Sequence, residues 1–243
     1  MIRHRFVALD GMRGIAALVV VAWHAGATRF IPGGYLAVDL FFVLSGFVLA
    51  HAFEGRQGWR AFMVARLKRL YPLYIAGLVM GALSARLYLL PDGRFWTTVG
   101  AGAAMLPTLV AWGVYRPYPF DPPAWSLLFE LLVNAVWFAL TPWLSLRLMG
   151  GIIVVSGACL AAVIVQSHGA AVGDAGPMFL PMVFVRATFS FFVGVACYRL
   201  WKVRGRAGGL LHGCSCSPSL HRLSRRSLER WWMLLLSLSS SRP

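Results

Sequence analysis

The stretch LDGMRGIAALVVVAWHAGATRFIPGGYLAVDLFFVLSGFVLAH, residues 9–51, decides the fold of this chain. It holds two apolar runs, each long enough to cross a lipid bilayer, joined by a short turn over residues 28–34. This pattern predicts a helical hairpin at the start of a multi-pass membrane protein. Ionisable residues lie inside both runs, and charges at membrane depth have a structural or functional reason.

Arg13 and His24 lie in the first run, eleven residues apart. Because a helix turns by about 100° per residue, both side chains return to nearly the same face, about 16 Å apart along the axis. They cannot contact each other, but they can contact two parts of one long ligand. The alternative is that Arg13 is an interfacial charge and His24 a histidine satisfied within the core.

Asp39 lies in the second run, at nearly the same distance from the Pro32 turn as His24 on the other side. In an antiparallel hairpin the two residues therefore lie at the same depth. A carboxylate beside an imidazole fixes its tautomer and raises its basicity, as a general base requires. We therefore expect Asp39 to orient His24; the alternative is that Asp39 is a polar packing residue.

The composition is that of a membrane protein, since 59% of the residues are hydrophobic and 13% are charged. The net charge of +15 is spread unevenly, because residues 202–243 hold eight Lys/Arg against one Asp/Glu. The remaining excess lies mostly in short loops, where a cytoplasmic positive bias explains it. The charge pattern therefore indicates a lipid bilayer as partner and no nucleic acid. The four cysteines form no CxxC pair and have no histidine at metal-ligand spacing, which predicts neither a metal site nor a disulfide framework.

The apolar runs predict an all-α transmembrane bundle with six full spans and one partial segment. The basic connection over residues 54–70 places itself and the N-terminus in the cytoplasm. The run 95–114 is rich in glycine and alanine and contains Pro107, so we expect it to be re-entrant or interfacial. The third span is expected to begin at Pro72, within its first turn. The predicted full spans cover residues 11–26, 35–53, 71–90, 125–143, 150–166 and 179–201.

This topology places four ionisable residues from four helices in the outer half of the membrane. They are His24, Asp39, Glu130 and Arg186. Charges at that depth normally face the bundle interior and pair with one another. A purely structural pair of Arg186 with Glu130 or Asp39 is the alternative to a catalytic layer.

Residues 202–243 differ in character from the membrane domain, residues 1–201. Serine occurs seven times in residues 1–204 and nine times in residues 205–243, and the apolar run 231–238 is too short to span. We expect this basic tail to be disordered or out of frame, and the alternative is a lipid-binding tail.

Several motifs occur together and in a fixed order from residue 9 to about 200. They are LDGMRGIAAL with the Arg13/His24 pair, GGYLAVDLFFVLSGF, RLKRLYPLY, AWSLLFELL and FFVGVACYRL. In this ordered set the chain resembles the acyltransferase 3 family of bacterial membrane O-acyltransferases, which includes O-antigen and nodulation-factor acetylases. The resemblance covers the N-terminal two-thirds of the family domain.

The resemblance implies transfer of an acyl group, commonly acetyl from acetyl-CoA, to a hydroxyl of a cell-surface glycan. It implies a multi-pass protein of the bacterial cytoplasmic membrane, with acyl-CoA as co-substrate and no permanently bound cofactor. The family motif carries over onto Arg13 and His24 as the essential pair, and onto Arg66 and Arg69 as a basic element at the cytoplasmic face. Arginines one turn apart can clamp the phosphates of coenzyme A; the alternative is a stop-transfer charge cluster.

The other site residues follow from this scheme. His24 would deprotonate the acceptor hydroxyl, and Arg186 or a nearby donor would stabilise the oxyanion. Glu130 joins the catalytic set, and Trp125 and Ser126, from the same motif, are expected to bind substrate.

The chain departs from the family in three respects. It has fewer predicted spans than family members, its tail resembles nothing in the family, and Leu131 stands where other members often have a second acidic residue. Two other functions therefore stay open: a small proton-coupled transporter that uses the charged layer as a relay, and a non-catalytic remnant.

Overall fold

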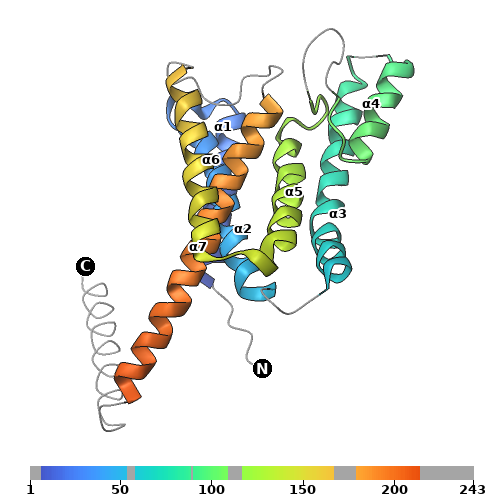
Figure 1. Cartoon of the computed structure of the whole chain (residues 1–243). Coiled ribbons are helices and arrows are strands. Elements are labelled where there is room, and N and C mark those ends of the chain that lie inside the picture. The colour runs from blue at the N-terminus through green and yellow to red at the C-terminus, as the bar shows by residue number, and fades with distance from the viewer. Residues whose placement is uncertain (1–6, 54–57, 89, 109–116, 167–178, 214–243) are drawn as a thin grey trace, which may run out of the picture. The chain divides into compact units, whose positions relative to one another are not determined.

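The computed structural model of the chain describes residues 7–53, 58–88, 90–108, 117–166 and 179–213, and these residues form helices and connecting turns without strands (Figure 1). The chain forms two compact units, Met1–Arg199 and Leu200–Pro243, and the contacts described below belong to the first. The helices are α1 (Val7–His24), α2 (Ala37–Phe53), α3 (Trp59–Ala85), α4 (Gly93–Ala103), α5 (Trp125–Leu140), α6 (Leu146–Gln166) and α7 (Phe179–Gly213).

The predicted hairpin is confirmed, because α1 and α2 pack along each other. Two short 3-10 turns, Ala27–Arg29 and Gly34–Leu36, join the helices. Gly34 lies directly against Trp23, and a Cβ at Gly34 would approach that side chain to 2.8 Å. The hairpin therefore closes tightly at its turn because this position carries no side chain.

Helices α2 and α7 approach each other closely through two glycines. A Cβ at Gly46 would overlap the carbonyl oxygen of Phe191, and a Cβ at Gly194 would overlap the carbonyl oxygen of Val43. The two glycines let the backbones meet, as small residues do between membrane helices. This contact makes α7, rather than α1, the partner of one face of α2.

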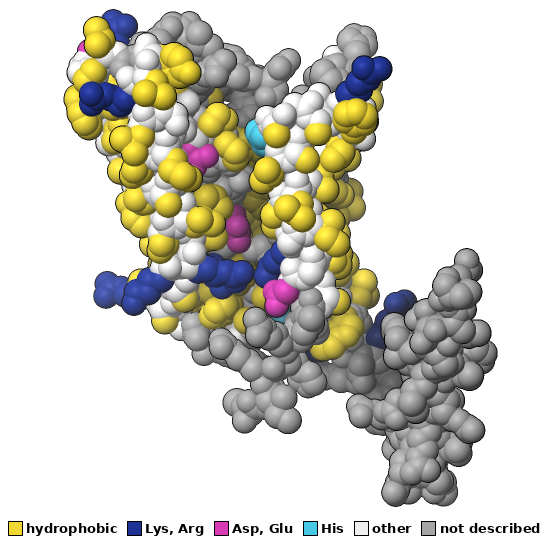
Figure 2. Space-filling model, turned by 180° about the vertical axis from the view of Figure 1, so that it is seen from behind, with side chains coloured by type: hydrophobic (Ala, Val, Ile, Leu, Met, Phe, Trp, Pro, Cys, Tyr) yellow, Lys and Arg dark blue, Asp and Glu magenta, His cyan; other side chains and the backbone are white. Residues whose placement is uncertain are grey.

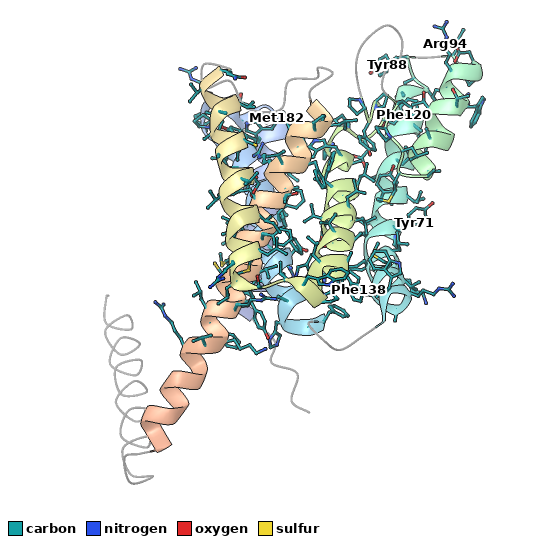
Figure 3. All side chains as sticks on the ribbon, in the orientation of Figure 1. Tyr71, Tyr88, Arg94, Phe120, Phe138 and Met182 are labelled. Carbon is teal, nitrogen blue, oxygen red and sulfur yellow. The ribbon has the colours of Figure 1, made fainter. Side chains whose placement is uncertain are left out.

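The main core joins α3, α5 and α7 through contacts between aromatic rings. The Phe62 ring lies 4.9 Å from the Phe138 ring and 5.9 Å from the Trp137 ring, and Trp137 lies 6.1 Å from Phe191. Figure 3 shows Phe138 at the lower end of α5, on the side toward α3. These contacts fix the relative register of the three helices.

Helix α3 begins earlier than predicted. The basic stretch from Trp59 continues without a break into the apolar stretch, and Pro72 lies inside the helix. The expectation that Pro72 marks the helix start is therefore wrong, because a proline can be accommodated in a long helix when neighbouring elements support the backbone.

Helix α4 is short and ends before the middle of its apolar run. Asp92 caps its start by accepting a hydrogen bond of 2.8 Å from the backbone N–H of Phe95. The helix has 11 residues, which corresponds to about 16 Å, roughly half of the hydrocarbon thickness. Beyond it Met105 adopts a φ of 58°, which turns the chain back. The described part of this run thus forms no full-length spanning helix.

Four helices of the described chain are long and apolar enough to cross a membrane. They cover Gly34–Phe53, Pro122–Trp143, Leu146–Gln166 and Leu180–Arg204. Large apolar side chains such as Leu18, Leu73 and Val154 are 69–80% exposed, as expected of a surface in contact with lipid. The protein is therefore a multi-pass membrane protein. The full count of six spans stays a prediction.

Candidate active site

Four of the predicted site residues come together on three helices. The charge of Arg13 on α1 interacts with those of Arg69 and Glu130, and the charge of Arg66 interacts with those of Arg69, Glu130 and Arg13. Arg66 is only 7% exposed, and the Arg13 side chain is 20% exposed. Figure 2 shows a hollow on this face, with Lys and Arg side chains on both of its walls and acidic side chains between them. These four residues are called the arginine cluster below.

The arginine cluster carries a surplus of positive charge in a partly buried place. The charges of Arg13 and Arg66 interact with that of Glu130 and with that of the exposed Arg69, and the carboxylate of Asp10 lies 3.9 Å from Arg13 Nη1. Like charges at short range repel each other more strongly where water is partly excluded. Such an arrangement is stable when an anion completes it, so the cluster has the electrostatics of an anion-binding site.

Glu130 has a second partner that the sequence did not predict. The Oγ of Ser45 on α2 donates a hydrogen bond of 2.8 Å to Glu130 Oε1. Ser45 is 3% exposed, and it directly precedes Gly46, which faces α7. The signal for this contact is a lone hydroxyl within an apolar helix, because such a group needs a partner. Ser45 thereby ties α2 to the arginine cluster.

Asp39 is held by α7. Arg186 Nε donates to Asp39 Oδ1 at 2.8 Å, and Arg186 Nη2 donates to Asp39 Oδ2 at 2.6 Å. The Ser190 hydroxyl also donates to Oδ1, at 3.2 Å. Arg186 lies over the Tyr35 ring and donates to the Tyr35 carbonyl oxygen at 3.2 Å. The alternative of a structural pair between Arg186 and Asp39 is the one that the structure contains.

These contacts correct two predictions. Asp39 does not orient His24, because its carboxylate oxygens bond to Arg186 and Ser190 on α7. Arg186 is also not placed as an oxyanion donor, since it is 5% exposed and held in a bidentate pair. The shared depth of His24 and Asp39 stays a prediction, and Asp39 lies on the face of α2 that meets α7.

His24 is oriented by its own helix instead. Its Nδ1 lies 2.9 Å from the Val20 carbonyl oxygen, and the Trp23 ring packs at 5.0 Å from the imidazole. Because a carbonyl oxygen only accepts hydrogen bonds, Nδ1 carries the proton in the neutral ring and Nε2 holds the lone pair. The side chain is exposed, so Nε2 is available as a base.

Trp125 and Ser126 lie in the first turn of α5, ahead of Glu130. The Ser126 hydroxyl donates to the Pro123 carbonyl oxygen at 2.9 Å, and Trp125 packs between two core clusters. The contacts of both residues thus help to start and anchor α5. Their predicted substrate contacts stay a prediction.

A small pocket lies near the start of α5, between α3, α4 and the segment 117–121. It has about 10 Å³ of free space, enough for about one water molecule. Tyr74 and Tyr118 close it by donating hydrogen bonds to the carbonyl oxygens of Gly102 and Met105. Asp121 also lines it, and burial raises the pKa of this carboxyl.

Comparisons with known proteins identify the family of the chain. The model of the acyltransferase 3 family, described as an acyltransferase domain, matches residues 6–238. The match reaches well past residue 201, into the tail that the sequence motifs did not cover. The chain therefore belongs to the acyltransferase 3 family.

Individual relatives match different shares of the chain. "Protein 2 in picA locus" of Rhizobium radiobacter is 43% identical over a segment that covers 55% of this chain and 81% of the relative. Acyltransferase MdmB of Streptomyces mycarofaciens is 30% identical over 59% of this chain and 42% of the relative. YrhL of Bacillus subtilis, whose name describes a peptidoglycan O-acetyltransferase, is 37% identical over 28% of this chain and 12% of the relative. No solved structure matches the chain.

Proposed function

We propose that this chain transfers an acyl group, in the first instance acetyl, from acyl-CoA to a hydroxyl of a cell-surface glycan at the bacterial cytoplasmic membrane. The observation that carries the proposal is the arginine cluster beside a helix that presents an exposed, oriented histidine eleven residues further on. The name of YrhL supports acetyl as the group and a glycan as the acceptor.

The arginine cluster suits the phosphate end of the donor. Coenzyme A carries a diphosphate and a 3′-phosphate, and guanidinium groups bind phosphate oxygens through paired N–H donors. Glu130, held by Ser45, is the counter-charge that keeps Arg13 and Arg66 together before the donor arrives. The cluster therefore pre-organises a site for the donor.

His24 suits the transfer step. Nε2 takes the proton of the acceptor hydroxyl while the hydroxyl oxygen attacks the thioester carbonyl carbon. The C–S bond then breaks, and the acyl group stays on the acceptor oxygen. The leaving thiolate of coenzyme A takes up the proton that His24 removed from the hydroxyl. Arg13 and His24 are about 16 Å apart along α1, so a donor with a long arm is needed to reach from one to the other.

The orientation of α1 fits the locations of the two substrates. We place the N-terminus in the cytoplasm, because the basic residues around Arg60 and Arg69 follow the positive-inside bias. Arg13 then lies toward the cytoplasm, where acyl-CoA is found, and His24 lies toward the outside, where the glycan is. With this orientation, the chain crosses the membrane six times, and α4 enters only part of the membrane.

The transporter alternative requires four charges in one connected layer. The contacts divide that layer into two sets, because Asp39 pairs with Arg186 while Glu130 bonds to Ser45 and belongs to the arginine cluster. His24 bonds to its own helix. The described contacts thus support two separate sets of residues and not one relay, which favours the acyltransferase function.

The test is donor binding and acetyl transfer in matched variants. Purified protein in detergent is titrated with coenzyme A, and membranes are assayed for transfer of labelled acetyl from acetyl-CoA to glycan. We expect Arg66→Ala/Arg69→Ala to lose binding and transfer, and His24→Ala to lose transfer while still binding the donor. Lys68→Ala is the control, because Lys68 is an exposed cation on the same turn of α3. Wild-type coenzyme A binding in Arg66→Ala/Arg69→Ala would contradict the assigned site.

A further inference from the structure

The unpartnered buried polar atoms of the described chain belong to only four residues. They are Arg66 Nε, both polar atoms of the Asn134 amide, Trp137 Nε1 and Thr188 Oγ1. Buried donors and acceptors normally have partners, because an unmade hydrogen bond keeps the full cost of desolvation. Asn134 stands out, since it is 0% exposed and both ends of its amide lack a partner.

Asn134 lies at the level of Arg66. Helices α3 and α5 are in contact and run in opposite directions (Figure 1), and Phe62 stacks on Phe138 at their lower ends. Arg66 follows Phe62 by four residues on α3, and Asn134 precedes Phe138 by four residues on α5. Both steps rise by about 6 Å on the stacked face.

Thr188 lies at the same level on α7. Helices α5 and α7 run in the same direction (Figure 1), and Trp137 contacts Phe191 across them at 6.1 Å. Three residues back from each of these aromatic residues lead to Asn134 and Thr188. The unpartnered groups therefore form one layer across α3, α5 and α7, with Trp137 one turn below it.

Arg66 faces both this layer and the arginine cluster. Of its three guanidinium nitrogens, Nε alone is buried without a partner, while its charge interacts with those of Arg13 and Arg69. The guanidinium lies 5.4 Å from the centre of the Phe53 ring, a contact that does not fix the direction of the N–H bonds. A guanidinium that binds phosphate bidentately needs that direction fixed.

We propose that Asn134 is a positioning residue of the donor site, whose Oδ1 accepts the Nε–H of Arg66 when the donor binds. This inference rests on the proposed function. The two groups already lie at one level, so the bond forms by side-chain rotation, and the Thr188 hydroxyl accepts from the Asn134 amide N–H on the other side. The terminal N–H groups of Arg66 are then directed at the phosphates of the donor.

The test compares variants at position 134. Asn134→Leu removes the acceptor at similar volume, and we expect the Kd for coenzyme A to rise about tenfold, with a smaller change in kcat than in the KM for acetyl-CoA. Asn134→Asp keeps an acceptor oxygen and is expected to bind coenzyme A close to the wild-type level. In an Arg66→Met background, Asn134→Leu should have no further effect, since its effect acts through Arg66.

The control is Ser156→Ala, which removes a buried hydroxyl on α6 that bonds to the Ile152 carbonyl oxygen of its own helix; it should leave the Kd unchanged. Thermal unfolding in detergent checks folding. An unchanged Kd in Asn134→Leu, or effects of the Asn134 and Arg66 changes that simply add, would overturn the inference while leaving donor binding intact. A wild-type chain that binds no coenzyme A would overturn the proposed function and this inference with it.

Discussion

The pair between Asp39 and Arg186 is a partly buried ion pair with two short hydrogen bonds, of 2.8 and 2.6 Å. The Arg186 side chain is 7% exposed and the Asp39 side chain 22%. Removing one partner would leave the other charge buried without compensation, which is far more costly than replacing both. The pair is therefore a structural link between α2 and α7.

We expect Arg186→Met to lower the free energy of unfolding by about 3–5 kcal/mol. The measurement is thermal or denaturant unfolding in detergent. The double change Asp39→Asn/Arg186→Met should recover a large part of this loss, because no isolated charge remains. A double variant as unstable as the sum of the two single changes would show that the two residues act separately.

Asp121, which precedes α5, gives the protein a pH-dependent stability. Burial raises the pKa of this carboxyl above its ordinary value, so the folded state binds a proton more readily than the unfolded state. Stability therefore falls as the pH rises from the ordinary pKa through the raised one. Above the raised pKa the folded state carries the full cost of a buried charge.

Asp121→Asn should consequently raise the unfolding temperature at neutral pH. The advantage over the wild type should shrink as the pH falls through the raised pKa, and it should be lost near pH ~4, where the aspartate is also protonated in the unfolded chain. Asp92→Asn is the matched control, because Asn also caps helices and Asp92 is exposed. An Asp121→Asn variant with the wild-type pH profile would contradict this account.

At the scale of elements, the contact between α2 and α7 depends on two glycines. A side chain at Gly46 or Gly194 would overlap a backbone carbonyl oxygen of the other helix. Carbonyl groups in the middle of a helix cannot move aside as a flexible side chain can. Any added Cβ must therefore separate the helices, and with them Asp39 and Arg186.

Gly46→Ala and Gly194→Ala should each destabilise the protein by about 1–3 kcal/mol through overpacking. Gly151→Ala on α6 serves as the control, since a Cβ there meets no atom within 4 Å, and it should be neutral or stabilising by up to about 1 kcal/mol. Unfolding in detergent measures all three. Equal effects at Gly46 and Gly151 would show that α2 and α7 are not in close contact.

The elements were predictable where length and hydrophobicity decide them. The hairpin of α1 and α2 and the apolar helices α5 and α6 follow directly from their runs. Helix α7 was predicted over 179–201 but continues to Gly213, into a stretch that was expected to be disordered or out of frame. The start of α3 did not follow from its run, because the basic stretch before Pro72 is helical for reasons of packing. Phe62 is buried against Phe138 of α5, and Arg66 is buried beside the Phe53 ring of α2. Sequence periodicity does not show which charged residues are covered by another helix.

The contacts of the site could be predicted only in part, and Glu130, expected in one layer with Asp39, bonds instead to Ser45, six residues further along α2. The motifs gave Arg13, Arg66 and Arg69, and the structure brings them together with Glu130. The pairing of Asp39 was misassigned, because the position of α7 beside α2 is fixed by glycines far along the chain. Which helices lie side by side in a bundle depends on such close approaches. The depth of a residue in the membrane does not predict them.

At the scale of the whole molecule, the proposed reaction depends on the orientation of the chain in the membrane. With the N-terminus in the cytoplasm, the arginine cluster lies toward the side that contains acyl-CoA, and His24 lies toward the glycan. With the opposite orientation the donor phosphates would have no access to the cluster. The proposed function therefore requires this orientation of the chain in the membrane.

Cysteine labelling of intact cells tests the orientation. In a variant without the four native cysteines, single cysteines are placed at Asp92, at the start of α4, and at Ser145, between α5 and α6; both positions are exposed. We expect a membrane-impermeant maleimide to label position 92 in intact cells and position 145 only after lysis. The basic residues that flank the inner ends of the helices retain that end in the cytoplasm. Labelling of position 145 in intact cells would place the arginine cluster on the outside, and the donor would then have to be an extracytoplasmic anion instead of acyl-CoA.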